Sequence, residues 1–576
     1  MEEKNEKLEM YRHSMAHVLA KAVTKLYPDV KLTIGPAIEH GFYYDVDLKQ
    51  NITPEDFAKI EDKMSEIIKN NEDFIRKEIS KAEALELFKD NQYKTELINE
   101  LPADEVISVY YLGEDFVDLC RGPHVENTKY LRGFAYKFNK VAGAYWRGNE
   151  RNKMLQRLYF YGFDNKNDLK EYLRLLEEAQ RRDHRKLGKE LGLYYISEYA
   201  PGCPTYMPNG MIVKNKLIEY WREMHRKAGY VEIETPITMN RTLWETSGHW
   251  EHYRKNMYTF KIEEEDFAVK PMNCPGCLLF YKENIHSYKE FPLRVGELGR
   301  VHRHEASGTL HGLMRVRTFT QDDAHIFMLP NQIADEVKNV LDLVEKMYKV
   351  FGLEYKLELS TMPEDHIGDV KDWEFAENSL KEALKKIGKD YELNEGDGAF
   401  YGPKIDIHIK DAIGRTWQCG TIQLDMQLPK RFGIEYIDSD GSKKEPVMIH
   451  RVIYGSIDRF IGIITENFAG AFPLWLSPVQ VKVMNISENS LDYARKVAEE
   501  LEKYEIRVEL DDRNESINKK IRDAQVSKTP YMLIVGDKEK ENNLVALRKR
   551  GEGDKGTIAL DEFIKNILAE IATKAL

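Results

Sequence analysis

The stretch Phe291–Thr320, FPLRVGELGRVHRHEASGTLHGLMRVRTFT, decides the fold of the middle of the chain. It has the pattern of strand, loop and strand, and the loop at 306–312 is small and flexible. The segments Met314–Thr320 and Ile405–Ile409 alternate in the way that is typical of antiparallel strands. We therefore expect an antiparallel sheet at the centre of the chain.

Arginines recur along this hairpin. Arg303 lies at the end of the first strand, and Arg315 and Arg317 should share one face of the second, because side chains alternate along a strand. Guanidinium groups on adjacent strands can converge on one phosphate through bidentate, charge-assisted hydrogen bonds. Phe319, on the same face, is suited to stacking on a purine, and Arg459 follows at an expected helix start. A salt-bridged surface hairpin is the alternative, so the arginines alone are weak evidence.

Three soft or borderline metal ligands, Cys274, His325 and His450, occur among these arginines. One thiolate and two imidazoles suit zinc, and three protein ligands leave a coordination position open, as in catalytic zinc sites. The alternative is that Cys274 and Cys277 form half of a structural zinc knuckle or a redox pair. No second Cys-x-x-Cys completes a knuckle and no thioredoxin-like context surrounds this one, so we favour the open site.

The length, net charge and cysteine content of the sequence limit the class of protein. The chain has 576 residues, too many for one core, so several domains are expected. Its net charge of −12 excludes a uniformly basic nucleic-acid binder but allows local basic patches. Five scattered cysteines fit a reducing compartment. The sequence has no apolar signal core at its start and no apolar run of membrane-spanning length, so we expect a soluble, cytoplasmic protein without a membrane partner.

We divide the chain into three blocks, residues 1–180, 183–476 and 477–576. The first opens with a helix that carries an apolar stripe and closes with a charged helix from Asp168 to about Leu187. In the second, a helix that stops at Gly229 precedes an expected strand, Val231–Thr235.

The last block alternates strands and helices, which indicates a small α/β domain. Its expected elements are strand Val479–Met484, helix Leu491–Tyr504, strand Ile506–Leu510, helix Glu515–Ala524, strands Tyr531–Val535 and Leu544–Leu547, and helix Leu560–Ala572. The whole chain is thus predicted to be a multidomain protein of mixed α/β and α+β architecture.

A second set of candidate ligands lies in the first block. His13 and His17 are four residues apart on the opening helix, so they share one face, away from the apolar stripe and free to line a cleft. Asp118, Cys120 and His124 follow later in the block. On spacing alone, His-x-x-x-His with Cys-x-x-x-His predicts a zinc site with four ligands.

Many of these stretches resemble the class II aminoacyl-tRNA synthetases. Gly229–Pro236 is similar to the first signature of that class, Arg303–Glu305 with Phe319 to the second, and Gly455–Phe460 to the third. Within the class, the stretches that resemble the threonyl-tRNA synthetase family are 310–317, 319–325, 396–404 and 417–421. The resemblance covers nearly the whole chain. It implies an N-terminal α+β editing domain, a catalytic core with an antiparallel sheet, and a C-terminal α/β anticodon-binding domain.

The resemblance implies that threonine and ATP give threonyl-adenylate and pyrophosphate, after which threonine moves to the terminal adenosine of its tRNA. Arg303 would hold the α-phosphate, and Arg459 the γ-phosphate together with Mg²⁺. The other ATP-binding residues that it implies are Glu305, Arg315, Phe319 and Gln418. It also implies catalytic roles for His249, near the terminal ribose, and for Lys404.

The resemblance makes Cys274, His325 and His450 the ligands of one zinc ion per subunit, which binds the amino group and the hydroxyl of threonine. Valine is nearly isosteric with threonine and an apolar pocket rejects it poorly, whereas a metal that requires an oxygen ligand excludes it. The polar residues expected around threonine are Gln321, Asp323, Tyr401 and Gln423. Asp323 is alternatively an acid that orients His325. We expect Cys277, where many family members have histidine, to turn away from the metal.

Serine also carries the hydroxyl, and its missing methyl group gives a discrimination of only about 1–3 kcal/mol, roughly 10–200-fold. That is too little for translation, so a hydrolytic check is expected. The first block resembles the editing domain shared by threonyl- and alanyl-tRNA synthetases, which implies hydrolysis of seryl-tRNA without metal, although the spacing leaves metal binding open. The editing residues so implied are His13, His17, Lys94, Asp118, Cys120 and His124.

The last block is similar to the anticodon-binding domain of this class. Asn514, Glu539 and Arg548 match positions that contact anticodon bases, whose edges suit hydrogen bonds from such side chains. A homodimer is implied, because the first signature builds the subunit contact. Only twelve residues precede His13, so we expect the chain to lack a further small domain that many family members carry there.

Two other functions are weighed against this one. The chain could be a class II synthetase for another amino acid, such as serine or proline. It could also be a catalytically silent paralogue that binds RNA as a regulator, against which the intact Arg303, Glu305 and Arg459 argue. Binding of its own messenger RNA in addition to catalysis stays open.

Overall fold

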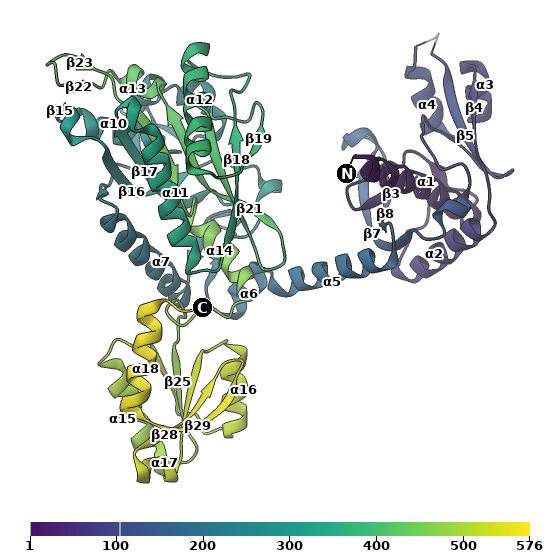
Figure 1. Cartoon of the computed structure of the whole chain (residues 1–576). Helices are drawn as coiled ribbons and strands as arrows, with labels where there is room; N and C mark the ends of the chain where they lie inside the picture. Colours follow the sequence, from purple (N-terminus) through teal and green to yellow (C-terminus); the bar gives the residue numbers. More distant parts are fainter. Residues whose placement is uncertain (1, 103–104) are drawn as a thin grey trace. The chain divides into compact units, whose positions relative to one another are not determined.

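The computed structural model describes residues 2–102 and 105–576, and its contacts divide the chain into two compact units, Met1–Glu177 and Glu178–Leu576 (Figure 1). The first unit is built on α1 (Glu2–Leu26). Met15, Val18 and Leu19 are fully buried in a core shared with α2 (Pro54–Lys69) and a five-stranded antiparallel sheet. The apolar positions recur every three or four residues, which gives the helix one buried face.

The sheet of the first unit has the order β1 (Lys31–Leu32), β3 (Gly41–Asp47), β8 (Met154–Phe163), β7 (Ala135–Tyr145), with β2 (Ala37–Ile38) paired to β3. A second sheet has the order β4 (Phe74–Ile79), β5 (Ile107–Leu112), β6 (Val117–Leu119), accompanied by α3 (Lys81–Leu87) and α4 (Gln92–Glu100). Helix α5 (Lys166–Arg182) follows these strands in the chain.

A large sheet forms the centre of the second unit. Within the described residues it has eight strands, in the order β11 (Val231–Glu232), β16 (Leu293–His302), β17 (Thr318–Met328), β24 (Val447–Val452), β21 (Thr416–Asp425), β20 (Lys404–Lys410), β18 (Glu354–Ser360), β19 (Glu392–Asn394). Neighbours are antiparallel except the pairs β11–β16 and β18–β19 at the two edges. The predicted antiparallel sheet is confirmed.

Four helices share one apolar core with this sheet: α7 (Pro208–Lys227), α11 (Ile333–Lys349), α12 (Val370–Ile387) and α14 (Ile457–Asn467). Strand alternation places Ile326 in that core and His325 and Phe327 on the other face. Phe327 there joins a second core with α8 (Arg241–Thr246) and α10 (Cys274–Lys282). The alternate residues Gln321, Asp323 and His325 of β17 project to this second face, as Phe327 does.

Shorter elements complete the middle of the chain: α6 (His184–Glu190), β9 (Tyr194–Ile196), β10 (Pro204–Tyr206), β12 (Thr238–Asn240), α9 (His249–His252), β13 (Thr259–Ile262), β14 (Glu265–Val269), β15 (His286–Ser287), α13 (Gln427–Phe432), β22 (Tyr436–Ile437) and β23 (Lys443–Lys444). The C-terminal part has a sheet of order β26 (Val508–Asp511), β25 (Val481–Asn485), β27 (Tyr531–Val535), β28 (Leu544–Lys549), β29 (Gly553–Ala559), with α15 (Leu491–Glu502), α16 (Ile517–Val526), α17 (Asp537–Asn542) and α18 (Leu560–Thr573). The sequence predicted the succession of these strands and helices along the chain, except for α17 and β29, and gave no order within the sheet.

Three expected elements differ from the structure. The strand expected at Met314–Thr320 begins only at Thr318, because Gly312 has a φ of 49° and starts a turn, so Arg315 and Arg317 do not lie on one strand face. The strand expected at Val231–Thr235 ends at Glu232. The charged helix is interrupted at Asp183, which leaves helical geometry and caps α6 with its side chain.

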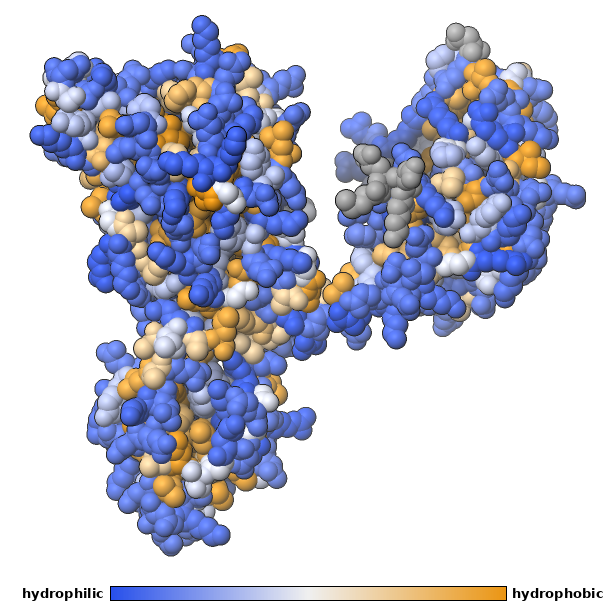
Figure 2. Space-filling view, in the orientation of Figure 1, coloured by the Kyte–Doolittle hydropathy of each residue, from blue (hydrophilic) through white to orange (hydrophobic). Residues whose placement is uncertain are grey.

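The surface is largely polar. Figure 2 shows hydrophilic residues over most of the visible face, with hydrophobic residues in small groups. Within residues 2–102 and 105–576, no helix combines the length and the hydropathy that crossing a membrane requires.

Candidate functional site

The three predicted zinc ligands come together from three elements. Cys274 is the first residue of α10, and His325 on β17 lies directly opposite His450 on β24. Residues opposite each other in an antiparallel pair project to the same face, so the two imidazoles meet. One ligand atom from each of the three residues lies within 4.8 Å of the others, and all three side chains are buried.

The donor atoms of this triad suit a metal ion. Both ring nitrogens of His325 are buried without a hydrogen-bond partner among the described residues, a costly state unless a ligand occupies it. His450 uses Nε2 to bind Asp425 Oδ2 at 2.8 Å, which leaves Nδ1 for a metal and supplies the carboxylate that often orients a metal-bound histidine. Burial raises the pKa of Cys274, so a thiolate there needs a nearby cation.

Cys277 is fully buried in the core between α10 and its neighbours. Within the described chain, the compact group of possible metal ligands at this site contains Cys274, His325 and His450 and does not include Cys277. That Cys277 is not a metal ligand stays a prediction.

Two members of the triad, Cys274 and His450, form part of the wall of a cavity of about 370 Å³, and His325 lies behind them, next to His450. All four residues predicted to surround threonine line this cavity: Gln321, Asp323, Tyr401 and Gln423. The Tyr401 hydroxyl donates a hydrogen bond to Gln423 Oε1, which fixes both side chains. Asn273 Nδ2 donates to Asp323 Oδ2 at 3.1 Å. Burial raises the pKa of Asp323 to about 6, although His450 and Asn273 oppose the shift.

A second cavity of about 260 Å³ adjoins the first, because Arg303, Gln321 and Thr421 line both. The predicted ATP residues all line this second cavity: Arg303, Glu305, Arg315, Phe319, Gln418 and Arg459. The guanidinium of Arg303 lies 5.2 Å from the ring centroid of Phe319. Arg459 Nε is buried and, among the described residues, has no partner, so it is available to a ligand. Arg317, in contrast, donates to the Glu305 carbonyl oxygen and stabilises the turn.

Two carboxylates that the sequence did not single out join strand β17 to the segment 453–458, which precedes Arg459. Asp322 is fully buried and accepts backbone hydrogen bonds from Ile453, Tyr454 and Gly455 at 2.8–3.0 Å. Burial raises the pKa of Asp322 to about 7. Asp458 accepts from the Thr320 backbone at 2.8 Å. Strand alternation could have revealed Asp322, because it places Asp322 and Asp323 on opposite faces of β17 and so gives them different roles.

Two predicted catalytic residues lie outside both cavities. His249 is completely buried, with Nε2 3.0 Å from Met272 Sδ and Nδ1 2.8 Å from Ser247 Oγ. Burial and neighbouring cations lower the pKa of His249 to about 3. Lys404 forms ion pairs with Asp406 at 2.8 Å and Asp397 at 3.1 Å. Neither residue is part of the cavity walls that the described chain forms.

The second candidate site, in the first unit, gathers four residues. His13, His17, Cys120 and His124 each place one ligand atom within 4.8 Å of the others. Cys120 Sγ lies 3.3 Å from His13 Nε2 and 3.2 Å from His124 Nε2. Burial lowers the pKa of all three histidines and raises that of Cys120 to about 11. The cluster therefore holds neutral imidazoles and a protonated thiol.

The remaining two predicted residues of this unit form a buried ion pair beside the cluster. Lys94 Nζ lies 2.5 Å from Asp118 Oδ1, and Tyr44 donates a hydrogen bond to the same carboxylate. Asp118 Oδ2 is 3.9 Å from His17 Nε2. Tyr44 was not predicted, because a tyrosine within a strand carries no local signal of function.

The three residues predicted to contact the anticodon lie on three different segments of the C-terminal part. Asn514 is exposed after β26, Glu539 caps α17 by accepting from Gly536, and Arg548 on β28 lies 3.5 Å from Asp554. Within the described chain, no hydrogen bond or ion pair joins the three to one another.

Known proteins resemble the chain along nearly its full length. Family models match residues 258–468 as a tRNA synthetase class II core domain (G, H, P, S and T), 480–570 as an anticodon binding domain, and 107–159 as a threonyl and alanyl tRNA synthetase second additional domain. A threonine–tRNA ligase of Clostridioides difficile is 60% identical over 574 residues, which are 99% of this chain and 89% of that protein. One of Clostridium tetani is 60% identical over 562 residues, 97% of this chain and 88% of that protein.

A solved structure is also similar. The RNA binding domain of threonyl-tRNA synthetase from Cryptosporidium parvum superposes with a TM-score of 0.66 at 43% identity. The match covers 67% of this chain and 98% of that one.

Proposed function

The chain belongs to the threonyl-tRNA synthetase family, and from this premise we propose which residues carry each step of its reaction. The enzyme attaches threonine to its tRNA with ATP, whose phosphates bring Mg²⁺, and its second additional domain edits mischarged tRNA. Because the matched relatives are threonine–tRNA ligases at 60% identity, neither another amino acid nor a silent paralogue is retained.

One observation carries the proposal: Cys274 and His450 line one cavity, Arg315 and Arg459 line the adjoining one, and Arg303 lines both. Threonine occupies the first cavity and ATP the second, so the α-phosphate lies beside Arg303, which both cavities share. Reactants held in this way need little rearrangement to reach the transition state. Arg303 stabilises charge on the α-phosphate, and Arg459 holds the far phosphates.

Within the first cavity, Cys274, His325 and His450 would hold one zinc ion. A bound zinc ion supplies a coordination position that an amino group and a hydroxyl can fill and a methyl group cannot. Tyr401 and Gln423 hold each other in place, and Asp323 faces the same space, so these side chains orient the substrate. Asp425 fixes the ring of His450.

In the second cavity, Phe319 and Glu305 hold the adenine, with Gln418 and Arg315 beside it. Phe319 offers a ring face, and Arg303 stacks on it from one side. Transfer to the tRNA needs a proton acceptor near the terminal ribose. We assign that step to His249. Met272 contacts His249 and lines the cavity, so the Met272 side chain has to move before His249 can reach the ribose. Lys404 would take its catalytic role once its ion pairs with Asp397 and Asp406 are broken.

In the first unit, the neutral imidazoles of His13, His17 and His124 accept a proton from water or orient it toward the ester of seryl-tRNA. Cys120 stays a thiol, because its pKa is raised, and so donates a hydrogen bond instead of attacking. Lys94 and Asp118 form the polar wall of the site.

The remaining assignments concern partners and domains. We place editing in residues 1–180, catalysis in 183–476 and anticodon contact in 477–576, through Asn514, Glu539 and Arg548. We also propose a homodimer, supported by the exposed Val231 and Ile237 next to β11, an edge strand. Sedimentation velocity of the full chain tests the dimer.

Pyrophosphate exchange that depends on the amino acid tests the proposal. Threonine should drive exchange, and Arg303→Ala should abolish it without changing the thermal midpoint of unfolding. Exchange that persists in Arg303→Ala would remove that arginine from the site.

A further inference from the structure

A buried histidine outside both cavities forms a hydrogen bond with the backbone of a residue that lines the proposed ATP site. His184 is the first residue of α6 and is fully buried. Its Nε2 accepts a hydrogen bond from the Leu313 backbone at 2.9 Å. Leu313 lines the cavity that we assign to ATP, next to Met314 and Arg315. The imidazole therefore holds the backbone of the turn that carries residues of the ATP site.

The contact of Nδ1 with Glu466 determines the tautomer of His184, and so whether Nε2 can accept a hydrogen bond. Nδ1 lies 2.6 Å from Glu466 Oε1, near the end of α14. Burial alone would raise the pKa of Glu466, but its hydrogen bonds to His184 and the charge of Arg415 outweigh it and lower that pKa. The carboxylate is then anionic and can only accept, so Nδ1 carries the proton and Nε2 keeps the lone pair that Leu313 needs.

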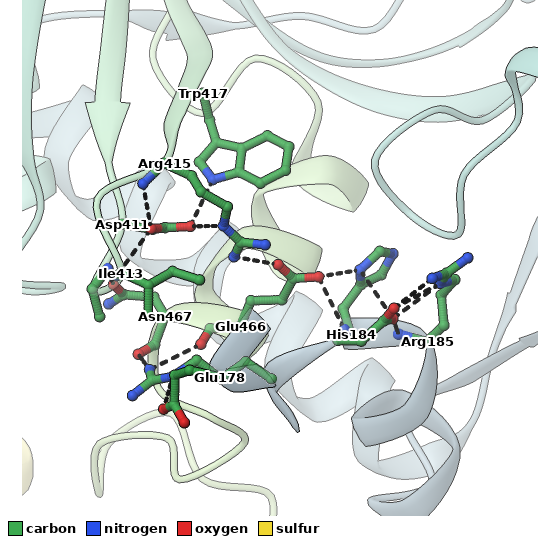
Figure 3. Close-up of polar contacts among 12 residues, drawn as sticks. Glu178, His184, Arg185, Asp411, Ile413, Arg415, Trp417, Glu466 and Asn467 are labelled. Carbon is green, nitrogen blue, oxygen red and sulfur yellow. Dashed lines mark hydrogen bonds and ion pairs between the residues drawn. The ribbon is translucent and has the colours of Figure 1, made fainter. Parts of the chain in front are cut away.

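Further contacts hold Glu466 in place. Figure 3 shows Glu466 between His184 and Arg415, with Asp411 beyond Arg415. Arg415 donates to Glu466 at 2.5 Å and to Asp411 at 2.7 Å. Arg182 donates to the carbonyl oxygens of Glu466 and Asn467, which end α14.

Gly312 of the turn packs closely against His184. A Cβ added to Gly312 would lie 2.1 Å from His184 Nε2, and the φ of 49° already disfavours other residues there. A Cβ at Gly462 of α14 would approach Leu313 Cβ at 3.3 Å and His184 Cδ2 at 3.5 Å. His184, the turn and α14 therefore pack as one body.

We propose that His184 is a positioning residue for ATP, which holds the 310–317 turn in its binding geometry through the Leu313 amide. The inference rests on the proposed placement of ATP beside Arg303 and Arg459. Without the imidazole acceptor the Leu313 N–H is buried and unpaired, and the turn shifts to find water. Threonine, in the other cavity, is not affected.

The test uses the full chain and three substitutions. His184→Asn retains a donor toward Glu466 but cannot reach Leu313, whereas the longer amide of His184→Gln can. Arg415→Gln weakens the same network without touching the turn. The KM for ATP and for threonine are measured in pyrophosphate exchange, ATP affinity by calorimetry, and folding by thermal unfolding.

We expect His184→Asn to raise the KM and Kd for ATP about tenfold, with the KM for threonine unchanged. His184→Gln should recover most of the loss, and Arg415→Gln should lower the unfolding midpoint with ATP binding intact. The proposal fails if ATP binding survives in His184→Asn, or if Arg415→Gln impairs it equally, which would make the role purely structural.

Two further variants keep the outcome decisive. If His184→Asn does not fold, Gly312→Ala tests the same contact from the side of the turn, and it should weaken ATP binding to a similar extent. Arg459→Ala distinguishes a failure of the proposed ATP site from a failure of the proposed role of His184. ATP affinity that is unchanged in Arg459→Ala overturns the ATP site itself, whereas a loss there with normal affinity in His184→Asn overturns only the role of His184.

Discussion

At the scale of single residues, His325 is the most informative side chain. A buried imidazole normally pairs both nitrogens, and neither nitrogen of His325 has a partner in the described chain. Its neighbour His450 has one nitrogen bound to Asp425 and the other left for a ligand. A metal ion takes one lone pair from each ring, which accounts for the free nitrogen of His450 and for one of the two unpaired nitrogens of His325.

Replacing one ligand tests this explanation. Cys274→Ser should lose the single zinc ion per subunit and reduce threonine-dependent exchange about 100-fold or more. Cys277→Ser, three residues away in the same helix, should retain the metal. Elemental analysis with exchange kinetics measures both effects. Equal metal content in the two variants would contradict the assignment, and two zinc ions in the native protein would make the His13 cluster a metal site.

The buried cluster in the first unit leads to a prediction on pH. An imidazole of ordinary pKa would lose about fourfold in its neutral fraction between pH 7.5 and pH 6. Burial lowers the pKa of His13, His17 and His124, so their neutral form persists as the pH falls through 6.5. Hydrolysis of seryl-tRNA by the cluster should therefore stay nearly constant over this range, after subtraction of the spontaneous rate.

His124→Ala is the matching variant. It should abolish hydrolysis of seryl-tRNA and leave threonine activation unchanged, because the two sites belong to separate compact units. A steep fall in hydrolysis with an apparent pKa near 6.5 would show that an exposed group does the work instead.

At the scale of elements, α14 links a cap to a substrate contact. Ser456 is its N-cap and accepts from the Arg459 backbone at 3.0 Å, while Asp322 holds the preceding residues. The guanidinium of Arg459 is thus directed into the cavity by the start of the helix. A substitution at the start of α14 should therefore weaken ATP binding more than it lowers the stability of the fold.

Ser456→Ala should destabilise the start of α14 by about 1 kcal/mol and raise the KM for ATP several-fold. Ser516→Ala removes the equivalent cap of α16, where Ser516 accepts from Lys519. It should cost similar local stability without changing the KM for ATP. Steady-state exchange and hydrogen exchange at the two helix starts compare them; identical KM values in both variants would refute the link.

Sequence reasoning found the residues with distinctive chemistry. Most cysteine, histidine and arginine residues of the two cavity walls were predicted, because few structural roles require them in such numbers, but Arg451 and Cys419 were not. It missed Asp322, Asp425 and His184, which act through hydrogen bonds between segments far apart in the chain. It also extended a strand through Arg315 and Arg317, since alternation alone does not reveal the turn at Gly312.

At the scale of the whole molecule, we propose that the anticodon of the tRNA is read by the C-terminal domain, which matches an anticodon binding domain, and that the two cavities carry out the chemistry. Arg548→Ala should raise the KM for tRNA in aminoacylation by about 5–150-fold, as expected for the loss of 1–3 kcal/mol. Pyrophosphate exchange, which needs no tRNA, should be unchanged. Arg522→Ala on α16, whose side chain has no predicted contact with bases, is the control. A loss of exchange in Arg548→Ala would indicate misfolding in place of lost recognition.

The central claim is that a metal bound by Cys274, His325 and His450 tells threonine from valine. The direct measurement is the ratio of kcat/KM for the two amino acids in exchange, before and after zinc is removed by chelation. We predict that the preference for threonine collapses in the metal-free protein and returns with added zinc. A metal-free protein that keeps the same preference would contradict the account and assign selectivity to the shape of the cavity.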